Sequence, residues 1–157
     1  MKGQQVAGNR TGERTIEGLD RRMPLVTAAR RVLLVRLESL AAMLPKARKA
    51  TSEQPEPVHQ LRVSTRRAEA ALAVFRPCIK GSRRRKLRDQ IRTIRNSAGA
   101  ARMADVHLNI FRRRLADCSD KDRVAMEYAV MRTQVARTTA QRDVTDAVNK
   151  SAAGKFK

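Results

Sequence analysis

Aromatic residues are scarce in this sequence: they make up 3% of its 157 residues, and tryptophan is absent. Proteins that grip single-stranded nucleic acid usually stack bases on aromatic rings. Here the rings are limited to Phe75, Phe111, Tyr128 and Phe156. This scarcity argues against the reading of bases and favours a ligand that is made of phosphate alone.

Cysteine and long apolar runs are also lacking. Cys78 and Cys118 are too few for a disulfide framework and lack the spacing of a metal site, so we interpret them as buried or idle thiols. No N-terminal apolar core indicates a signal peptide, and no apolar run reaches the about 20 residues that a membrane-spanning helix needs. We therefore expect a cytoplasmic protein that has no membrane partner.

Acidic residues are outnumbered by basic ones. The chain has 35 Lys and Arg against 15 Asp and Glu, a formal net charge of +20, and 26 of the 35 are arginine. Lysine would serve solubility equally well. Arginine offers a planar fork of donors that pairs bidentately with phosphate oxygens and is less strongly hydrated than lysine. The arginine bias therefore indicates a polyanionic partner.

No β-type alternation of useful length appears, and apolar residues recur at helical spacing instead. The sequence predicts an all-α fold, an antiparallel helical bundle. The first helix would be capped by Asp20, carry Pro24 in its opening turn, and end or kink at Pro45. Residues 45–57 would form a connector.

The segment from Val58 to Phe75 predicts a helix with two stripes, opened by Pro57 and ending near Arg76. The buried stripe would consist of Val58, Leu61, Thr65, Ala68, Leu72 and Phe75. On a neighbouring face, His59, Arg62 and Arg66 follow steps of three and four, so one imidazole and two guanidinium groups point the same way. His59 would lie in the first turn, where free backbone N–H groups favour an anion.

The next predicted helix, residues 81–98, repeats this design. Its apolar stripe would be Leu87, Ile91, Ile94 and Ala98, and its flank would carry Arg84, Arg88, Arg92 and Arg95. Like charges one turn apart repel by a few tenths of a kcal/mol per pair, and Asp89 relieves little of this. A ligand that neutralises the flank explains it better than solvent does.

Gly99 should break this helix or let two backbones approach closely. A fourth helix, residues 102–116, would turn Leu108, Phe111 and Leu115 inward. A final helix, residues 120–149, would bury Val124, Tyr128, Met131, Val135 and Val148. The predicted organisation is a disordered basic tail over residues 1–18, one helical bundle over residues 19–150 and a frayed C-terminus over residues 151–157.

Two stretches resemble the signatures of the CHAD family, α-helical domains named for their histidines. The stretch Val58-His59-Gln60-Leu61-Arg62-Val63-Ser64-Thr65-Arg66-Arg67 is similar to V-H-x-x-R-V-x-x-R-R. The stretch Gly99-Ala100-Ala101-Arg102-Met103-Ala104-Asp105-Val106 is similar to G-x-x-R-D-x-D-V. The basic helix lies between them, as in the family, and the resemblance spans roughly residues 20–149.

The resemblance implies a helical fold, typically two four-helix bundles related by pseudo-twofold symmetry, and binding of inorganic polyphosphate at a basic surface between them. Some members of the family travel with triphosphate-tunnel hydrolases. We expect no cofactor. Ligand-facing residues would be His59, Arg62, Arg66, Arg67, Arg84, Arg88, Arg92, Arg95 and Arg102. Arg67 departs from the others, because the helical wheel places it about 80° from His59.

The chain departs from the family at two points. Met103 stands where an aspartate is usual, which leaves Asp105 to form an internal ion pair with an arginine; nearby His107 would be a surface residue or a second phosphate contact. The chain is also about half the usual family length. We therefore expect two chains to pair about a twofold axis and rebuild the two-bundle arrangement, as a homodimer.

These patterns predict a non-catalytic polyphosphate-binding protein, cytoplasmic or associated with polyphosphate or storage granules. The sequence contains none of the motifs that would indicate an enzyme of this kind. It lacks the Glu-x-Glu-x-Lys of the triphosphate-tunnel hydrolases, a glycine-rich phosphate loop and a carboxylate cluster for magnesium. His59 would add a pH dependence, because phosphate favours its protonated form. Two alternatives stay open: a nucleic-acid-binding protein that uses the same basic face, and an accessory subunit of a triphosphatase.

Overall fold

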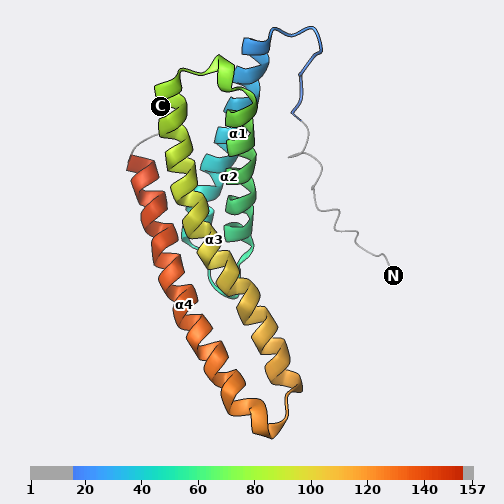
Figure 1. Cartoon of the computed structure of the whole chain (residues 1–157), viewed down its shortest axis with the longest axis vertical. Coiled ribbons are helices and arrows are strands. Elements are labelled where there is room, and N and C mark those ends of the chain that lie inside the picture. Colours follow the sequence, from blue (N-terminus) through green and yellow to red (C-terminus); the bar gives the residue numbers. More distant parts are fainter. Residues whose placement is uncertain (1–15, 154–157) are drawn as a thin grey trace, which may run out of the picture.

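The computed structural model describes residues 16–153, with side chains as far as residue 151. Four helices and one short 3₁₀ turn follow one another: α1 (Leu25–Arg48), α2 (Glu56–Val74), η1 (Arg76–Cys78), α3 (Gly81–Asp117) and α4 (Asp120–Ala153). Consecutive helices run antiparallel, and no strand occurs within residues 16–153 (Figure 1). The predicted all-α antiparallel bundle is confirmed.

The helices differ in length, and this divides the molecule into two parts (Figure 1). At one end, which we call the four-helix end, α1 and α2 pack beside the first half of α3 and the second half of α4. At the other end, α3 and α4 continue alone as a pair of helices, which we call the projecting hairpin. The two termini of α2 therefore lie beside different parts of α3.

The main core lies in the four-helix end. Leu40, Leu61, Ile91, Ile94 and Val144 are completely buried there, one or two from each helix. The predicted apolar stripe of α2 is confirmed, since Val58, Leu61, Thr65, Ala68 and Leu72 are at most 3% exposed and Phe75 is half-buried. The stripe predicted for residues 81–98 is confirmed as well.

The start of α1 differs from the prediction. Asp20 accepts a hydrogen bond from the backbone N–H of Arg22 at 2.6 Å, and this turn precedes the helix. Pro24 occupies the N-cap position, and its carbonyl accepts the N–H of Ala28 at 3.0 Å. Asp20 therefore does not cap α1.

Pro45 was expected to end or kink the first helix, but α1 continues through it to Arg48. A proline inside a helix removes one backbone hydrogen bond. Here the loss falls in the last turn, where Ala47 is completely buried and holds the chain in helical geometry. The connector between α1 and α2 is correspondingly shorter than predicted and covers residues 49–55.

The largest difference concerns Gly99. The sequence predicted separate helices at 81–98 and 102–116, yet α3 runs without interruption from Gly81 to Asp117. Glycine costs about 1 kcal/mol relative to alanine in a helix interior. Ala98 and Ala101, on either side of it, are completely buried, so packing outweighs the local preference.

The buried side of α4 was predicted only in part. Val148 is buried, as expected, whereas Val124, Tyr128, Met131 and Val135 are 52–75% exposed. The second half of α4 packs through Arg137, Ala140, Val144, Ala147 and Val148. At about 100° per residue these two sets lie on opposite sides of the helix. The prediction for the first half of α4 was wrong.

The ends of the chain fall partly outside the description. Of the tail predicted over residues 1–18, residues 1–15 lie outside the described residues. α4 extends to Ala153, past the predicted end at residue 149, and residues 154–157 lie outside the description. Among the described helices, none combines the length and the hydropathy that crossing a membrane requires.

Candidate anion-binding face

Uninterrupted α3 aligns five arginines along one flank. Arg84, Arg88, Arg92, Arg95 and Arg102 fall within an arc of about 80° at about 100° per residue. From first to last they span about 27 Å at about 1.5 Å per residue. A break at Gly99 would have turned Arg102 in an unrelated direction, so the continuity of α3 brings the second signature into line with the basic helix.

α2 brings a second set of basic side chains beside this flank. The residues of α2 that were predicted to contact an anion, His59, Arg62 and Arg66, lie within about 60° of one another around the helix axis. The Nη1 atom of Arg62 lies 3.0 Å from the point where a Cβ on residue 99 would sit. The missing side chain of Gly99 therefore leaves room for this guanidinium group against α3.

A second contact fixes the relative position of α2 and α3. Arg95 Nη1 lies 2.5 Å from Glu69 Oε2, two turns further along α2 than Arg62. With Arg62 opposite Gly99 and the helices antiparallel, the first turn of α2 lies beside the segment of α3 that carries Arg102. We call this shared surface the basic face: His59, Arg62, Arg66, Arg84, Arg88, Arg92, Arg95 and Arg102.

The acid in the basic face was not foreseen from the sequence. Glu69 is one of the residues that continue the Arg62 and Arg66 spacing, so the helical wheel could have found it. Its side chain is 19% exposed and that of Arg95 is 35% exposed. Arg88 lies 3.8 Å from Asp89, but both of these side chains are more than half exposed. Within the basic face, Arg95 is thus the residue most neutralised by the chain's own acids.

The environment of His59 also differs in part. It lies in the first turn of α2, as predicted, but its backbone N–H and that of Val58 both donate to the carbonyl of Pro55, at 3.2 and 3.1 Å. Pro57 has no N–H. The first turn therefore offers an anion few free backbone donors, and its contribution would come mainly from side chains.

Arg67 is not brought to the basic face. It follows Arg66 directly and lies about 140° around α2 from Arg62. Its half-buried side chain interacts with other groups of the chain. Of the nine residues that the family resemblance implied, the structure therefore gathers eight and leaves Arg67 on the other flank of α2.

A groove of about 310 Å³ adjoins the Arg102 end of the basic face. The connector lines one wall with Ser52, Glu53 and Pro55, and α3 lines the other with residues that include Arg102, Asn109, Arg112 and Arg113. The Ser52 hydroxyl donates to the Glu53 carboxylate and lowers its pKa, to which Arg112 adds a smaller electrostatic contribution. Glu53 therefore places one negative charge beside these arginines.

A comparison with protein-family models identifies the family of this domain. The model of the CHAD domain matches residues 31–157, which include all of α2, α3 and α4. The chain belongs to the CHAD domain family. A search of curated proteins found no match, and a search of solved structures found none either.

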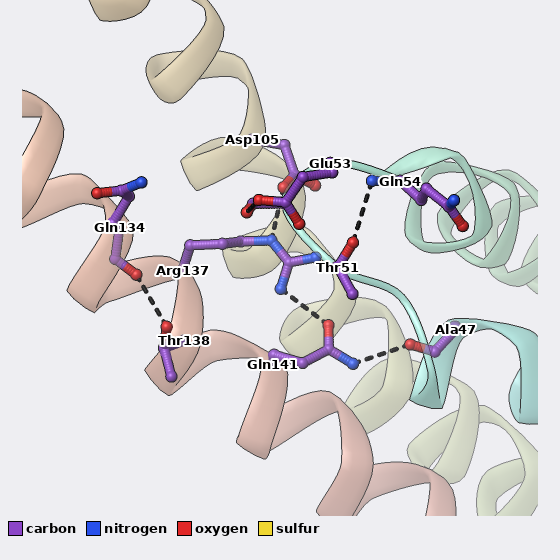
Figure 2. Close-up of polar contacts among 10 residues, drawn as sticks. Ala47, Thr51, Glu53, Gln54, Asp105, Gln134, Arg137, Thr138 and Gln141 are labelled. Carbon is purple, nitrogen blue, oxygen red and sulfur yellow. Dashed lines mark hydrogen bonds and ion pairs between the residues drawn. The ribbon is translucent and has the colours of Figure 1, made fainter.

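Within this CHAD domain, Asp105 of the second signature forms a buried ion pair, as predicted. Its Oδ1 accepts a hydrogen bond from Arg137 Nε at 2.5 Å, and the two side chains are 2% and 4% exposed. Arg137 Nη1 donates to Gln141, whose amide donates to the carbonyl of Ala47 (Figure 2). The same amide nitrogen also lies 3.1 Å from the carbonyl of Arg48. This chain of contacts joins α3, α4 and the last turn of α1.

The remaining signature positions lie away from the basic face. His107 is exposed, with its ring centroid 6.1 Å from that of Phe111, and lies about 140° around α3 from Arg102. Met103, which replaces the usual aspartate of the CHAD signature, is 58% exposed. Cys78 and Cys118 are half-buried free thiols; Cys78 is the last residue of η1, and Cys118 is the C-cap residue of α3.

Proposed function

We propose that this CHAD domain binds inorganic polyphosphate along the basic face, without catalysing its cleavage. The observation that carries the proposal is the alignment of five arginines on the flank of α3, with Arg62 of α2 seated against the same flank at Gly99. Polyphosphate carries about one negative charge on each internal phosphate. A rigid row of guanidinium groups matches such a uniform chain of charge.

The chemistry of the face favours polyphosphate over nucleic acid. Single-stranded nucleic acid is usually held by bases stacked on aromatic rings as well as by phosphate contacts. None of the residues that form the basic face is Phe, Tyr or Trp; Phe111 lies in the last turns of α3, and Tyr128 lies in the first turns of α4. The basic face therefore offers guanidinium groups for phosphates but no aromatic ring for bases, which suits a ligand made of phosphate alone.

Binding without catalysis is part of the proposal. Polyphosphate hydrolases position divalent metal ions with clustered carboxylates. Among the described residues, Glu69 makes the shortest acidic contact with the basic face, and its carboxylate is bound to Arg95. We therefore assign the face the role of holding the polymer, and a hydrolase assay with magnesium and manganese checks that phosphate is not released.

The test compares two double variants that lose the same charge. Arg88→Gln/Arg92→Gln removes two exposed guanidinium groups from the basic face, and Arg30→Gln/Arg142→Gln removes two exposed ones elsewhere. We expect the first variant to bind long-chain polyphosphate about tenfold more weakly, or ~1.4 kcal/mol, and the second to remain within about twofold of the parent. If both variants lose affinity equally, polyphosphate is attracted by the net charge of the whole molecule and not by the basic face, and the proposal is wrong.

Salt and competition complete the test. If about six phosphates are neutralised, affinity should fall on the order of a thousandfold between 50 and 200 mM salt, by the counterion release established for DNA. Polyphosphate should displace single-stranded DNA of equal charge from the protein. If DNA displaces polyphosphate instead, nucleic acid is the preferred ligand of the basic face.

A further inference from the structure

The projecting hairpin carries an apolar stripe that no part of the described chain covers. Val124, Tyr128, Met131 and Val135 recur at steps of four, three and four, and at about 100° per residue they fall within about 60° of one another on α4. They are 75%, 59%, 52% and 60% exposed. We call these four residues the α4 outer stripe.

The stripe faces away from the rest of the hairpin. Towards α3, the first half of α4 turns Met126, Ala129, Val130 and Thr133, all of them less exposed than the stripe. These residues lie on the opposite side of α4 from the stripe. α4 is therefore apolar on two opposite sides over this stretch, although an unpartnered surface helix normally has one apolar side.

The stripe has defined ends. Continuing its spacing leads to Thr138 and Arg142, both exposed and polar, where the second half of α4 lies against the four-helix end. The stripe thus occupies about three turns, in the region where only α3 accompanies α4 (Figure 1). A helix from another molecule can approach there without meeting α1 or α2.

The spacing and the flanking charges select the occupant. Steps of four and three form a heptad seam in which Tyr128 and Val135 take the a positions and Val124 and Met131 the d positions. Glu127 then takes a g position and Arg132 an e position, about 70° to either side of the stripe. Charges at e and g set partner choice and orientation in coiled coils.

We propose that the α4 outer stripe binds the α4 outer stripe of a second copy of this chain, with the two α4 helices parallel about a twofold axis. In a parallel pair, the flank that carries Glu127 meets the opposite flank of the other chain, which carries Arg132. Two such ion pairs form, one on each side of the seam. In an antiparallel pair each flank meets its own copy, and both ion pairs are lost.

The segments outside the described residues do not fit the stripe equally well. Residues 1–15 contain Met1, Val6 and Ala7 as their apolar side chains, and residues 154–157 contain Phe156 alone. Neither segment has apolar residues at the spacing of a helical seam. A second stripe supplies four apolar side chains at matching spacing. A second copy of the α4 outer stripe therefore supplies the facing a and d residues that the heptad pattern requires.

The expected association is weak. The stripe offers on the order of 400 Å² of apolar surface per chain, so the pair buries less than the about 1,200 Å² of a standard interface. Each chain also carries a formal charge of +20, and the two chains repel each other. Salt screens this repulsion, so dimerisation should strengthen with salt, whereas polyphosphate binding should weaken.

Sedimentation velocity in 0.5 M NaCl, without any polyanion, tests the proposal. Between about 5 and 500 µM protein, the mass should rise from 17.6 kDa towards twice that value. Met131→Glu should keep the chain monomeric. Met103→Glu, the same change at an exposed methionine of α3, should leave association unchanged. A constant monomer mass up to 500 µM, or equal effects of both variants, overturns the proposal.

Two further measurements test the orientation. Glu127→Arg and Arg132→Glu should each weaken the dimer about three- to tenfold, and the double variant should recover it. In a Cys78→Ser/Cys118→Ser background, Val124→Cys should form a disulfide-linked dimer by itself, because d positions meet their own copies across a parallel seam. A disulfide that forms only between the Val124→Cys and Val135→Cys chains would show an antiparallel pair and overturn the proposal.

Discussion

The four-helix end and the projecting hairpin use the same kind of sequence pattern with opposite results. In the four-helix end, apolar residues at steps of three and four are buried, as Leu61 and Ile94 show with no exposed surface. In the hairpin, an equally regular series on α4 stays more than half exposed. Periodicity identifies the apolar side of a helix, but the number of neighbouring helices decides whether that side is covered.

The largest expected effect comes from breaking the contact where the two parts meet. Arg137→Met leaves the buried carboxylate of Asp105 without its partner, and we expect a loss of about 3–5 kcal/mol in the free energy of unfolding. Urea denaturation measures it. Arg132→Met, which removes an exposed arginine of the same helix, is the control. Measured at a concentration where the chain is monomeric, it should change stability by less than about 0.5 kcal/mol.

Replacing both members of the pair provides the second half of that test. Asp105→Leu/Arg137→Met removes both charges, and we expect it to recover most of the lost stability. If the double variant is as unstable as Arg137→Met alone, the loss comes from Gln141 and the last turn of α1 rather than from the unpaired carboxylate.

The same substitution at two valines of α4 compares the two parts directly. Val144 is completely buried in the four-helix end, and Val135 is 60% exposed on the hairpin. Val144→Ala should cost about 2–3 kcal/mol through lost burial and the remaining cavity. Val135→Ala, measured at a concentration where the chain is monomeric, should stay within about 0.5 kcal/mol. Similar losses would mean that the hairpin is more closely packed than its exposure indicates.

Gly99→Ala tests the continuity of the helix that connects the two parts. Removing a glycine from a helix interior should stabilise the protein by about 0.5–1 kcal/mol, because the unfolded chain loses freedom. The new Cβ would meet only the flexible end of Arg62, which can move aside. The midpoint of thermal unfolding should therefore shift upward by about 1–4 °C. A downward shift would show that Arg62 is held too rigidly against α3 to make room.

The smallest expected effect concerns the acid within the basic face of the four-helix end. Glu69→Gln frees Arg95 from its carboxylate partner, and we expect polyphosphate to bind about two- to threefold more tightly. Glu38→Gln makes the same change in charge at an exposed position of α1 and serves as the control. If the two variants bind equally, Arg95 lies outside the ligand's path.

Local rules predicted most of the helices and much of the face. The apolar stripe of α2 and the basic flank of α3 follow from spacing within single segments. An ion pair of Asp105 with an arginine was also expected, but the sequence did not identify Arg137 of α4 as that arginine. The unbroken α3 did not, since the helix preference of Gly99 is worth about 1 kcal/mol and the burial of its alanine neighbours outweighs it. The Glu69–Arg95 contact joins two helices, and its partner could not be read from either helix alone.

The outer side of α4 eluded prediction for a different reason. A sequence pattern states that Val124, Tyr128, Met131 and Val135 prefer to leave water, but it does not state what they contact instead. The periodicity predicted that these four residues pack inside the chain. Because α3 and α4 are longer than α1 and α2, the four residues lie on the part of α4 that extends past the four-helix end, and they are exposed.

The row of arginines on the flank of α3 also affects how a uniform polymer would exchange on it. Since neighbouring phosphates are alike, a polymer that shifts along α3 by one phosphate presents the same groups to the same arginines. Many registers are then almost equal in energy, so a polymer longer than the flank gains affinity from the number of places at which it can bind. Residence would be governed by sliding past the end of the helix as well as by lifting away from it.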